Sequence, residues 1–170
     1  TSTQNLTLSL DTSTSVTATI ISGGSTYTDN IVNIENIKSG AGADNITGDT
    51  FKNTFWGGAG NDIFVYNSAA ESSPDSKDKL TGSFNDASAD TIELSTKVGT
   101  VTVIPMQNAG VNASALNAYV IDGLLNSTTG KAATRFSGGH NTNVAILNTS
   151  DGKKFFAIDI DGSGTFTNDD

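Results

Sequence analysis

The stretch that decides the fold is residues 39–65, SGAGADNITGDTFKNTFWGGAGNDIFV, which divides into three consecutive units of nine residues. The third unit, residues 57–65, fits the pattern GGxGxDxUx, where U is apolar, at every specified place: Gly57, Gly58, Gly60, Asp62 and Phe64. The first unit, residues 39–47, lacks only the leading glycine and keeps Gly40, Gly42, Asp44 and Ile46. The middle unit, residues 48–56, has Asn53 in the aspartate place but keeps the period.

Each unit predicts a turn followed by a very short strand, because glycines allow the positive φ and the close backbone approach that such a turn requires. The apolar residues at 37, 46, 55 and 64 then face inward. Stacked units form a two-sided parallel β-roll, in which neighbouring turns on one side are eighteen residues apart, as Asp44 and Asp62 are. An ordinary antiparallel hairpin explains one glycine turn, but three units in phase favour the roll.

The donors in these turns suit calcium. Carboxylates and glycine carbonyls are hard oxygen ligands, which calcium prefers. Softer metals prefer cysteine and histidine, and the sequence has no cysteine and one histidine. We therefore expect calcium ligands among Gly40, Gly42, Asp44, Gly57, Gly58, Gly60 and Asp62. On the opposite side of the roll, the corresponding sixth places are Glu35, Asn53 and Glu71, with Asp49 nearby, which predicts a weak site or none.

The nonapeptide is the calcium-binding repeat of RTX proteins, and the chain resembles this glycine-rich class, which bacterial type I systems export. The sequence FVYNSAAESSP, followed by Phe84 and DTIELS, is similar to the carboxy-terminal β-roll domain of serralysin-type secreted metalloproteases over about residues 57–95. This resemblance implies that Asp78 and Asp90 are further calcium ligands. The alternative is that both are solvated loop acids.

The last twelve residues, DIDGSGTFTNDD, have the spacing of an EF-type calcium loop. Its ligand places hold the side chains of Asp159, Asp161, Ser163 and Asp170, and the main-chain carbonyl of Thr165 stands at the seventh place. The segment KKFFAI that enters the loop is strand-like, which departs from a true EF-hand and resembles the DxDGxGxF loops of RTX-exported proteins. A hairpin turn rich in acids is the alternative.

The rest of the chain is also typical of a β protein. Polar and apolar residues alternate over residues 4–28, and strands are predicted near 100–105, 134–136, 144–147 and 154–160, with one helix over about 112–126. We expect a mainly β fold: a short parallel β-roll continuous with additional β-strands and one α-helix. It would form a single domain over residues 1–170, with a repeat core at 30–65 and a β-rich part at 96–170. Because the chain begins at Thr1, we expect a fragment of a larger protein.

Charge and composition narrow the possible partners. Eighteen acidic residues against nine basic ones give a formal charge of −9, which argues against nucleic acid and anionic membranes. No apolar run is long enough for a membrane span, and no signal peptide is visible. Because the sequence has no cysteine, no disulfide bond can stabilise the fold, and we expect several calcium ions to stabilise it in an extracellular protein.

Neither an HExxH zinc motif nor a GxSxG nucleophile elbow is present, so we predict that these residues carry no enzyme activity. We expect a calcium-binding structural module of a type I-secreted cell-surface protein, such as a surface-layer protein or adhesin, which folds on binding calcium outside the cell. The alternative is the noncatalytic carboxy-terminal domain of a secreted zinc metalloprotease or lipase. Besides calcium, the candidate partners are a second copy in a surface lattice and a cell-surface glycan.

Overall fold

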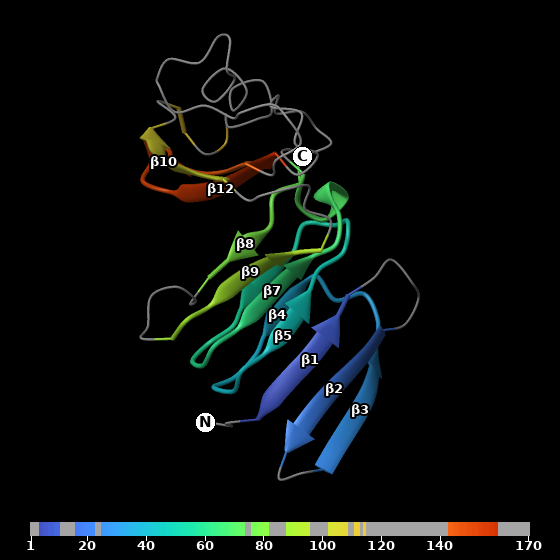
Figure 1. Ribbon diagram of the computed structural model, residues 1–170. Coiled ribbons are helices and arrows are strands. Elements are labelled where there is room, and N and C mark those ends of the chain that lie inside the picture. Colours follow the sequence, from blue (N-terminus) through green and yellow to red (C-terminus); the bar gives the residue numbers. More distant parts are fainter. Residues whose placement is uncertain are drawn as a thin grey trace. The chain divides into compact units, whose positions relative to one another are not determined.

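A computed structural model describes residues 4–10, 16–22, 25–73, 76–81, 88–95, 102–108, 111, 112, 114 and 143–159 (Figure 1). The chain divides into two compact units. The first comprises residues 1–72 and 76–95, and the second comprises residues 73–75 and 96–170. The two units are described separately below. The expectation of a single domain over residues 1–170 stays a prediction.

The first unit contains the predicted roll, built from two parallel sets of short strands. One set is β5 (Asn45–Thr47), β7 (Ile63–Tyr66) and β9 (Thr91–Leu94), and the other is β4 (Asn36–Lys38), β6 (Thr54–Trp56) and β8 (Lys79–Leu80). Ile46 pairs with Phe64 and Ile37 pairs with Phe55, so paired residues are eighteen apart over the repeats. This register confirms the predicted roll and its period.

The roll begins earlier in the chain than the repeats suggest. Strand β1 (Asn5–Ser9) pairs in parallel with β5, and Leu8 stands opposite Ile46. An antiparallel meander then adds β2 (Val16–Ser22) and β3 (Ser25–Ile31), which gives a six-stranded sheet in the order β3-β2-β1-β5-β7-β9 (Figure 1). The apolar alternation predicted over residues 4–28 therefore forms one extension of the roll sheet.

After β7 the parallel ladder continues, but its spacing in the sequence changes. Phe64 pairs with Ile92 and Phe55 pairs with Leu80, at separations larger than eighteen. The 3₁₀ helix η1 (Ala69–Ser72) lies in the longer connection between β7 and β8. Insertions in the turns, rather than the end of the roll, explain why the sequence period stops at residue 65.

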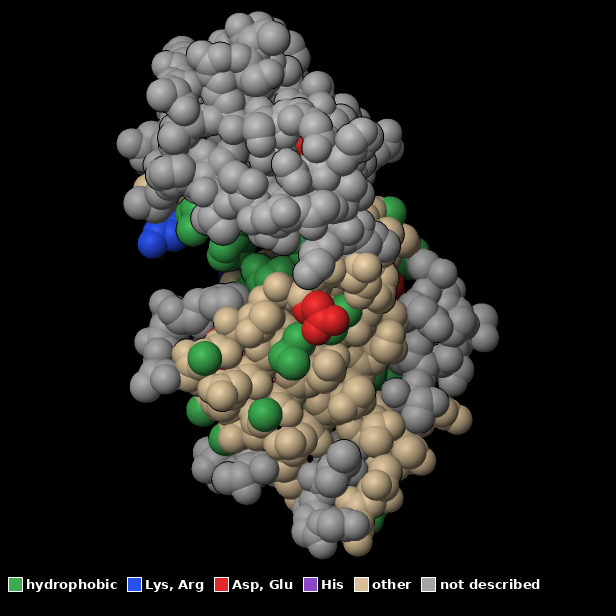
Figure 2. Space-filling view, in the orientation of Figure 1, with side chains coloured by type: hydrophobic (Ala, Val, Ile, Leu, Met, Phe, Trp, Pro, Cys, Tyr) green, Lys and Arg blue, Asp and Glu red, His purple; other side chains and the backbone are tan. Residues whose placement is uncertain are grey.

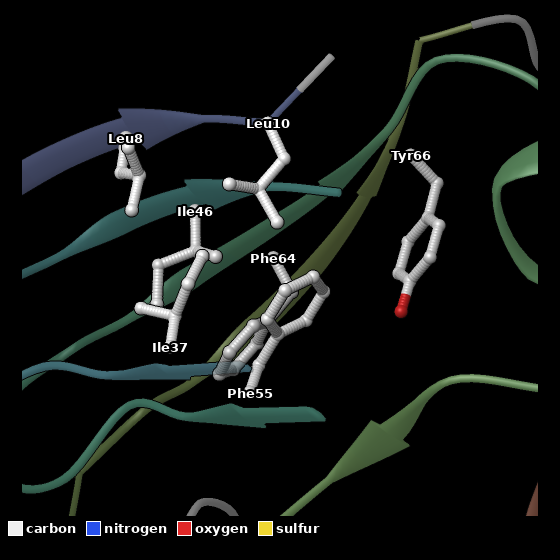
Figure 3. Close-up of a cluster of buried hydrophobic side chains, with 7 residues drawn as sticks. All are labelled: Leu8, Leu10, Ile37, Ile46, Phe55, Phe64 and Tyr66. Carbon is white, nitrogen blue, oxygen red and sulfur yellow. The ribbon is translucent and has the colours of Figure 1, made fainter. Parts of the chain in front are cut away.

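The core of the first unit lies between its two sheets and is drawn in Figure 3. The predicted inward residues are all buried there, and the rings of Phe55 and Phe64 stack with their centroids 6.3 Å apart. Burying one such side chain contributes about 1.5–3 kcal/mol, so these residues fix which face of each short strand points inward. The whole cluster consists of Leu8, Leu10, Ile37, Ile46, Phe55, Phe64 and Tyr66.

The second unit contains a three-stranded sheet in the order β10-β11-β12. Its strands are β10 (Thr102–Asn108), β11 (Asn143–Asn148) and β12 (Lys154–Asp159), with β10 parallel and β12 antiparallel to β11. Three of the predicted strands are confirmed. The predicted helix over about 112–126 and the strand near 134–136 lie outside the described residues, apart from isolated positions. No helix among the described residues is long and apolar enough to cross a membrane.

Candidate metal centre

One side of the roll, here called the aspartate side, consists of the turns at residues 39–44 and 57–62 and of residues 88–90. Asp44, Asp62 and Asp90 end these segments, and each directly precedes a strand of the six-stranded sheet. Asp62 Oδ1 accepts a hydrogen bond from the main-chain N–H of Asp44 (3.0 Å), and Asp90 Oδ1 accepts one from the N–H of Asp62 (3.0 Å). The three carboxyl groups therefore stack in successive turns.

The start of β1 completes this ladder without a carboxylate. The N–H of Leu6 donates to Asp44 Oδ1 (2.8 Å), as the N–H of Asp44 does to Asp62. Asn5 Oδ1 accepts from the N–H of Ala43 (3.0 Å), and Asn61 Oδ1 accepts from the N–H of Ala89 in the same way (3.0 Å). The first residues of β1 therefore stack on the aspartate side, with Leu6 in the sixth place.

Asp44 and Asp62 are buried, with exposed fractions of 1% and 0%. The carboxylate of Asp44 accepts hydrogen bonds from the N–H groups of Leu6 and Gly40 (2.8 and 3.3 Å). Amide donors supply hydrogen bonds but no positive charge, and burying ionised carboxylates without a compensating charge is costly. A cation between the turns would supply that charge.

Glycines bring the turns of this side into backbone contact. Gly58 and Gly60 have φ values of 94° and 119°, in the left-handed region that side chains avoid. A Cβ atom built on Gly58 would lie 1.9 Å from the carbonyl oxygen of Gly40, and one on Gly60 would lie 2.1 Å from that of Gly42. The glycine pattern is thus a packing requirement, and it places main-chain carbonyls of one turn against the next.

The donor set on the aspartate side is mixed. Among the described residues, no three side chains of His, Cys, Asp or Glu are grouped so as to hold a metal ion. An ion here would need main-chain carbonyls beside the carboxylates, which is a normal ligand set for calcium. Two of the predicted carbonyls already accept hydrogen bonds: the hydroxyl of Ser39, in the place of the leading glycine, donates to Gly57 O, and the N–H of Ala59 donates to Gly40 O (3.1 Å). With those exceptions, the residues fit a calcium ion.

The other side of the roll, here called the asparagine side, consists of residues 48–53 and 67–78. Asn53 is buried and takes the place that Asp62 has on the aspartate side. Its Oδ1 accepts from the N–H of Asp49 (3.1 Å), and its Nδ2 donates to Asp49 Oδ1 (3.1 Å). The amide thus pairs with the one carboxylate beside it.

Asp78 continues this side. Its Oδ1 accepts from the N–H of Asn53 (2.7 Å), while the hydroxyl of Tyr66 donates to its Oδ2 (3.3 Å). Burial raises the pKa of Asp78 to about 7, with smaller upward contributions from the charges of Asp49 and Glu71. Burial also raises the pKa of Glu71, and burial together with Asp78 raises that of Tyr66. The raised pKa of Asp78 means that it binds a proton readily in the metal-free protein.

The structure revises two expectations about these acids. The sixth place after Asn53 belongs to Asp78 and not to Glu71, because the inserted segment with η1 displaces the repeat. Asp78 and Asp90 are not loose loop acids, since each occupies a sixth place in the ladder. The sequence signal for these positions is an aspartate two residues before an apolar residue of a short strand, Leu80 or Ile92, and it survives when the eighteen-residue spacing does not. Whether they bind metal stays a prediction.

In the second unit, Asp159 ends β12 and is buried, with an exposed fraction of 0%. The other predicted ligands of the carboxy-terminal loop lie outside the described residues: Asp161, Ser163, Thr165 and Asp170. The structure therefore places one member of that predicted site and leaves the loop itself a prediction.

Comparison with known proteins agrees with the roll and its aspartate ladder. Neither curated proteins nor solved structures gave a significant match to this chain. The family described as Peptidase M10 serralysin C terminal matches residues 3–169. That family is the RTX-type calcium-binding β-roll domain of type I-secreted proteins. Because the match spans nearly the whole chain, the protein belongs to the Peptidase M10 serralysin C-terminal family.

Proposed function

We propose that the roll of the first unit is a calcium-dependent folding module of a secreted protein, with calcium bound between the stacked turns of the aspartate side. One observation carries this proposal: the buried carboxylates of Asp44 and Asp62 stack in adjacent turns, and the glycines of these turns bring the main-chain carbonyls of one turn against the next. Burying two carboxylates in adjacent turns disfavours the metal-free fold, because their negative charges repel each other. A divalent cation bound between the turns would instead attract both carboxylates.

The ligands would come from both turns. Asp44 and Asp62 supply the carboxylates, and the carbonyls supply the remaining oxygens: Gly40, Gly42, Gly57, Gly58 and Gly60. Gly57 and Gly40 are the least favourable of these, because Ser39 and Ala59 already donate to their carbonyls. Asp90 extends the same ladder and adds a carboxylate to the next gap.

Calcium would stabilise a small domain that has no cysteines and therefore no disulfide bonds. Extracellular calcium modules bind with dissociation constants of about 10⁻⁴–10⁻³ M, so free calcium about ten to a hundred times higher adds about 1.4–2.7 kcal/mol per site. Cytosolic calcium lies far below these constants. The chain would therefore stay loosely folded until export and fold outside the cell.

We assign weaker or secondary sites to the remaining predicted acids. On the asparagine side, Asp49 accepts a hydrogen bond from the side-chain amide of Asn53, which competes with a metal ion. The loop that begins at Asp159 is a separate candidate in the second unit.

We consider two classes of parent protein. The composition, rich in Thr, Ser and Asn, favours a structural module of a cell-surface protein, in which the roll would stiffen a surface layer or adhesin. The family match favours the noncatalytic carboxy-terminal domain of a secreted enzyme. An HExxH motif upstream in the parent sequence supports the enzyme, while long threonine-rich repeats support the surface protein.

Hydrogen exchange tests the folding module directly. Amides that bond between turns, such as Ile63 N–H to Asp44 O (2.8 Å) and Thr91 N–H to Asp62 O (2.8 Å), report on the roll. We expect strong protection in millimolar calcium and weak protection in excess chelator or in magnesium. The amides of β11 and β12 serve as an internal reference in the second unit. Equal protection of residues 39–65 in all three conditions would contradict the proposal.

A further inference from the structure

Strand β3 lies at the edge of the six-stranded sheet and is exposed along its length. Six of its seven residues are exposed, Tyr27 by 59%, and only Ile31 is partly covered. It pairs with β2 on one side, from Ser25 to Ile31, and no described strand pairs with its other side. In Figure 1, β3 forms the outer border of the meander.

Hydrogen bonds of β1 determine which main-chain groups of β3 point outward. The N–H groups of Leu6 and Leu10 donate toward the β5 side of β1, to Asp44 Oδ1 and Thr47 O. Main-chain groups alternate sides along a strand, so those of Thr7 face β2 and bond with its partner Thr19. Thr19 is opposite Thr28, whose N–H and C=O must then point away from β2. The main-chain groups of Thr26, two residues before Thr28, point the same way.

This edge has few of the features that keep strands from pairing. Lysine, proline and inward charges are the usual protection of an exposed edge. The sequence of β3, STYTDNI, has no lysine or proline, and Asp29 is its one charged residue. On a chain with a net charge of −9, this strand is a place where two copies can approach with little repulsion.

We propose that β3 is a self-association edge, which pairs antiparallel with β3 of a second copy about a two-fold axis at Thr28. Thr28 is the midpoint of Ser25–Ile31, so this register uses the whole strand. It sets Thr28 opposite Thr28 of the second copy and Tyr27 opposite Asp29, and it joins the two six-stranded sheets into one. A pairing centred on Asp29 would instead oppose two carboxylates, which is unfavourable.

The second copy is the occupant that this edge fits best, because a two-fold pair needs a strand that matches itself. The register above pairs threonine with threonine and an aromatic residue with an acid, and no charge meets a like charge. One strand pair is smaller than a standard stable interface, so we expect a weak dimer that forms at high local concentration. The inference does not depend on which ions the roll binds.

Lysine substitutions separate the edge from the face of the sheet. Thr7, Thr19 and Thr28 lie in one cross-strand row, with Thr7 exposed on the central strand β1 and Thr28 exposed on the edge. In the 170-residue chain with millimolar calcium, sedimentation equilibrium should show a dimer. Thr28→Lys places two ammonium groups opposite each other and should raise the dimer dissociation constant about fivefold or more. Thr7→Lys makes the same charge change and should leave it unaltered.

Single cysteines test the register, because the chain has none of its own. In the proposed pair the two Thr28 Cα atoms lie about 5.5 Å apart, within disulfide range, whereas two Thr26 positions lie more than about 13 Å apart. Thr28→Cys should therefore cross-link on mild oxidation, and Thr26→Cys should not. A monomer at every concentration, equal effects of Thr28→Lys and Thr7→Lys, or equal cross-linking of the two cysteine variants would each overturn the proposal, the first favouring a strand from another protein.

Discussion

The two sides of the roll carry the same ladder of strands but fill their turns differently. On the aspartate side, the turn glycine Gly58 packs on backbone: a Cβ there would meet only main-chain atoms of Gly40. On the asparagine side, the turn glycine Gly48 faces side chains instead, since a Cβ there would meet Asn53 Oδ1 at 2.8 Å. Side chains that bond to one another occupy the space on that side.

The difference shows two ways of burying acids in one fold. The asparagine side offsets its acids internally, through the amide of Asn53 and through the raised pKa of Asp78, which favours a bound proton. The aspartate side has carboxylates at both Asp44 and Asp62, and main-chain amides donate to them. We expect a fold stabilised in this second way to depend on an external cation. Figure 2 shows a group of acidic atoms exposed on the face in view, whereas Asp44 and Asp62 are buried.

The largest expected effect comes from Gly58→Ala. The substitution adds a Cβ 1.9 Å from a main-chain oxygen and a side chain at a φ of 94°, so we expect a loss of about 3–4 kcal/mol in the free energy of unfolding. Gly48→Ala is the matched change on the other side, where side chains can shift, and should cost about 1–2 kcal/mol. Urea unfolding in calcium measures both. Equal losses would mean that the two sides are packed alike.

Asn53→Asp converts one side toward the other. It removes the donor to Asp49 and sets two buried carboxylates together, so we expect a loss of about 2–3 kcal/mol in calcium-free buffer. Calcium should restore part of that loss, since the new carboxylate reproduces the aspartate ladder. Asn36→Asp, at an exposed place on β4, is the control for added charge. If Asn53→Asp costs no more than this control, the amide is not what neutralises that side.

A smaller effect is expected from pH. The pKa of Asp78 is raised from 3.8 to about 7 in the folded protein, so the folded state holds a proton that the unfolded chain releases. The free energy of unfolding of the calcium-free protein should therefore fall as pH rises from about 4 to about 7. We expect about 1 kcal/mol, because solvent reaches Asp78 and screens its charge. Asp78→Asn should flatten this dependence in urea unfolding at several pH values, and an unchanged slope would contradict the assignment.

The sequence was sufficient to predict the roll, its eighteen-residue spacing and its core. Periodic glycines and apolar residues report local geometry, and Ile46 and Phe64 are buried where the period places them. It did not reveal β1 as the first strand of the ladder, because residues 4–6 contain no glycine. In addition, β1 pairs with β5 across a separation of 38 residues. Pairing across such a distance depends on tertiary contacts rather than on a local pattern.

The candidate site shows the same limit. Asp44 and Asp62 follow from the repeat, but the places of Asp78 and Asp90 were hidden by insertions of different length in two turns. The insertion before β8 also brought Glu71 into η1 instead of the ladder. A count of residues fails after an insertion, whereas hydrogen bonds from one turn to the next still identify equivalent positions.

Asp62→Asn tests the central claim most directly. Asparagine keeps an Oδ1 acceptor for the N–H of Asp44 and nearly the same shape, while it removes the charge and replaces the second oxygen by an NH2 group. The measurement is the free energy of unfolding with and without millimolar calcium, for the natural chain and the variant. If calcium binds between the aspartate turns, the variant should be at least as stable as the natural chain without calcium, and it should lose at least one site's gain of about 1.4–2.7 kcal/mol. An undiminished calcium gain in Asp62→Asn would contradict the account.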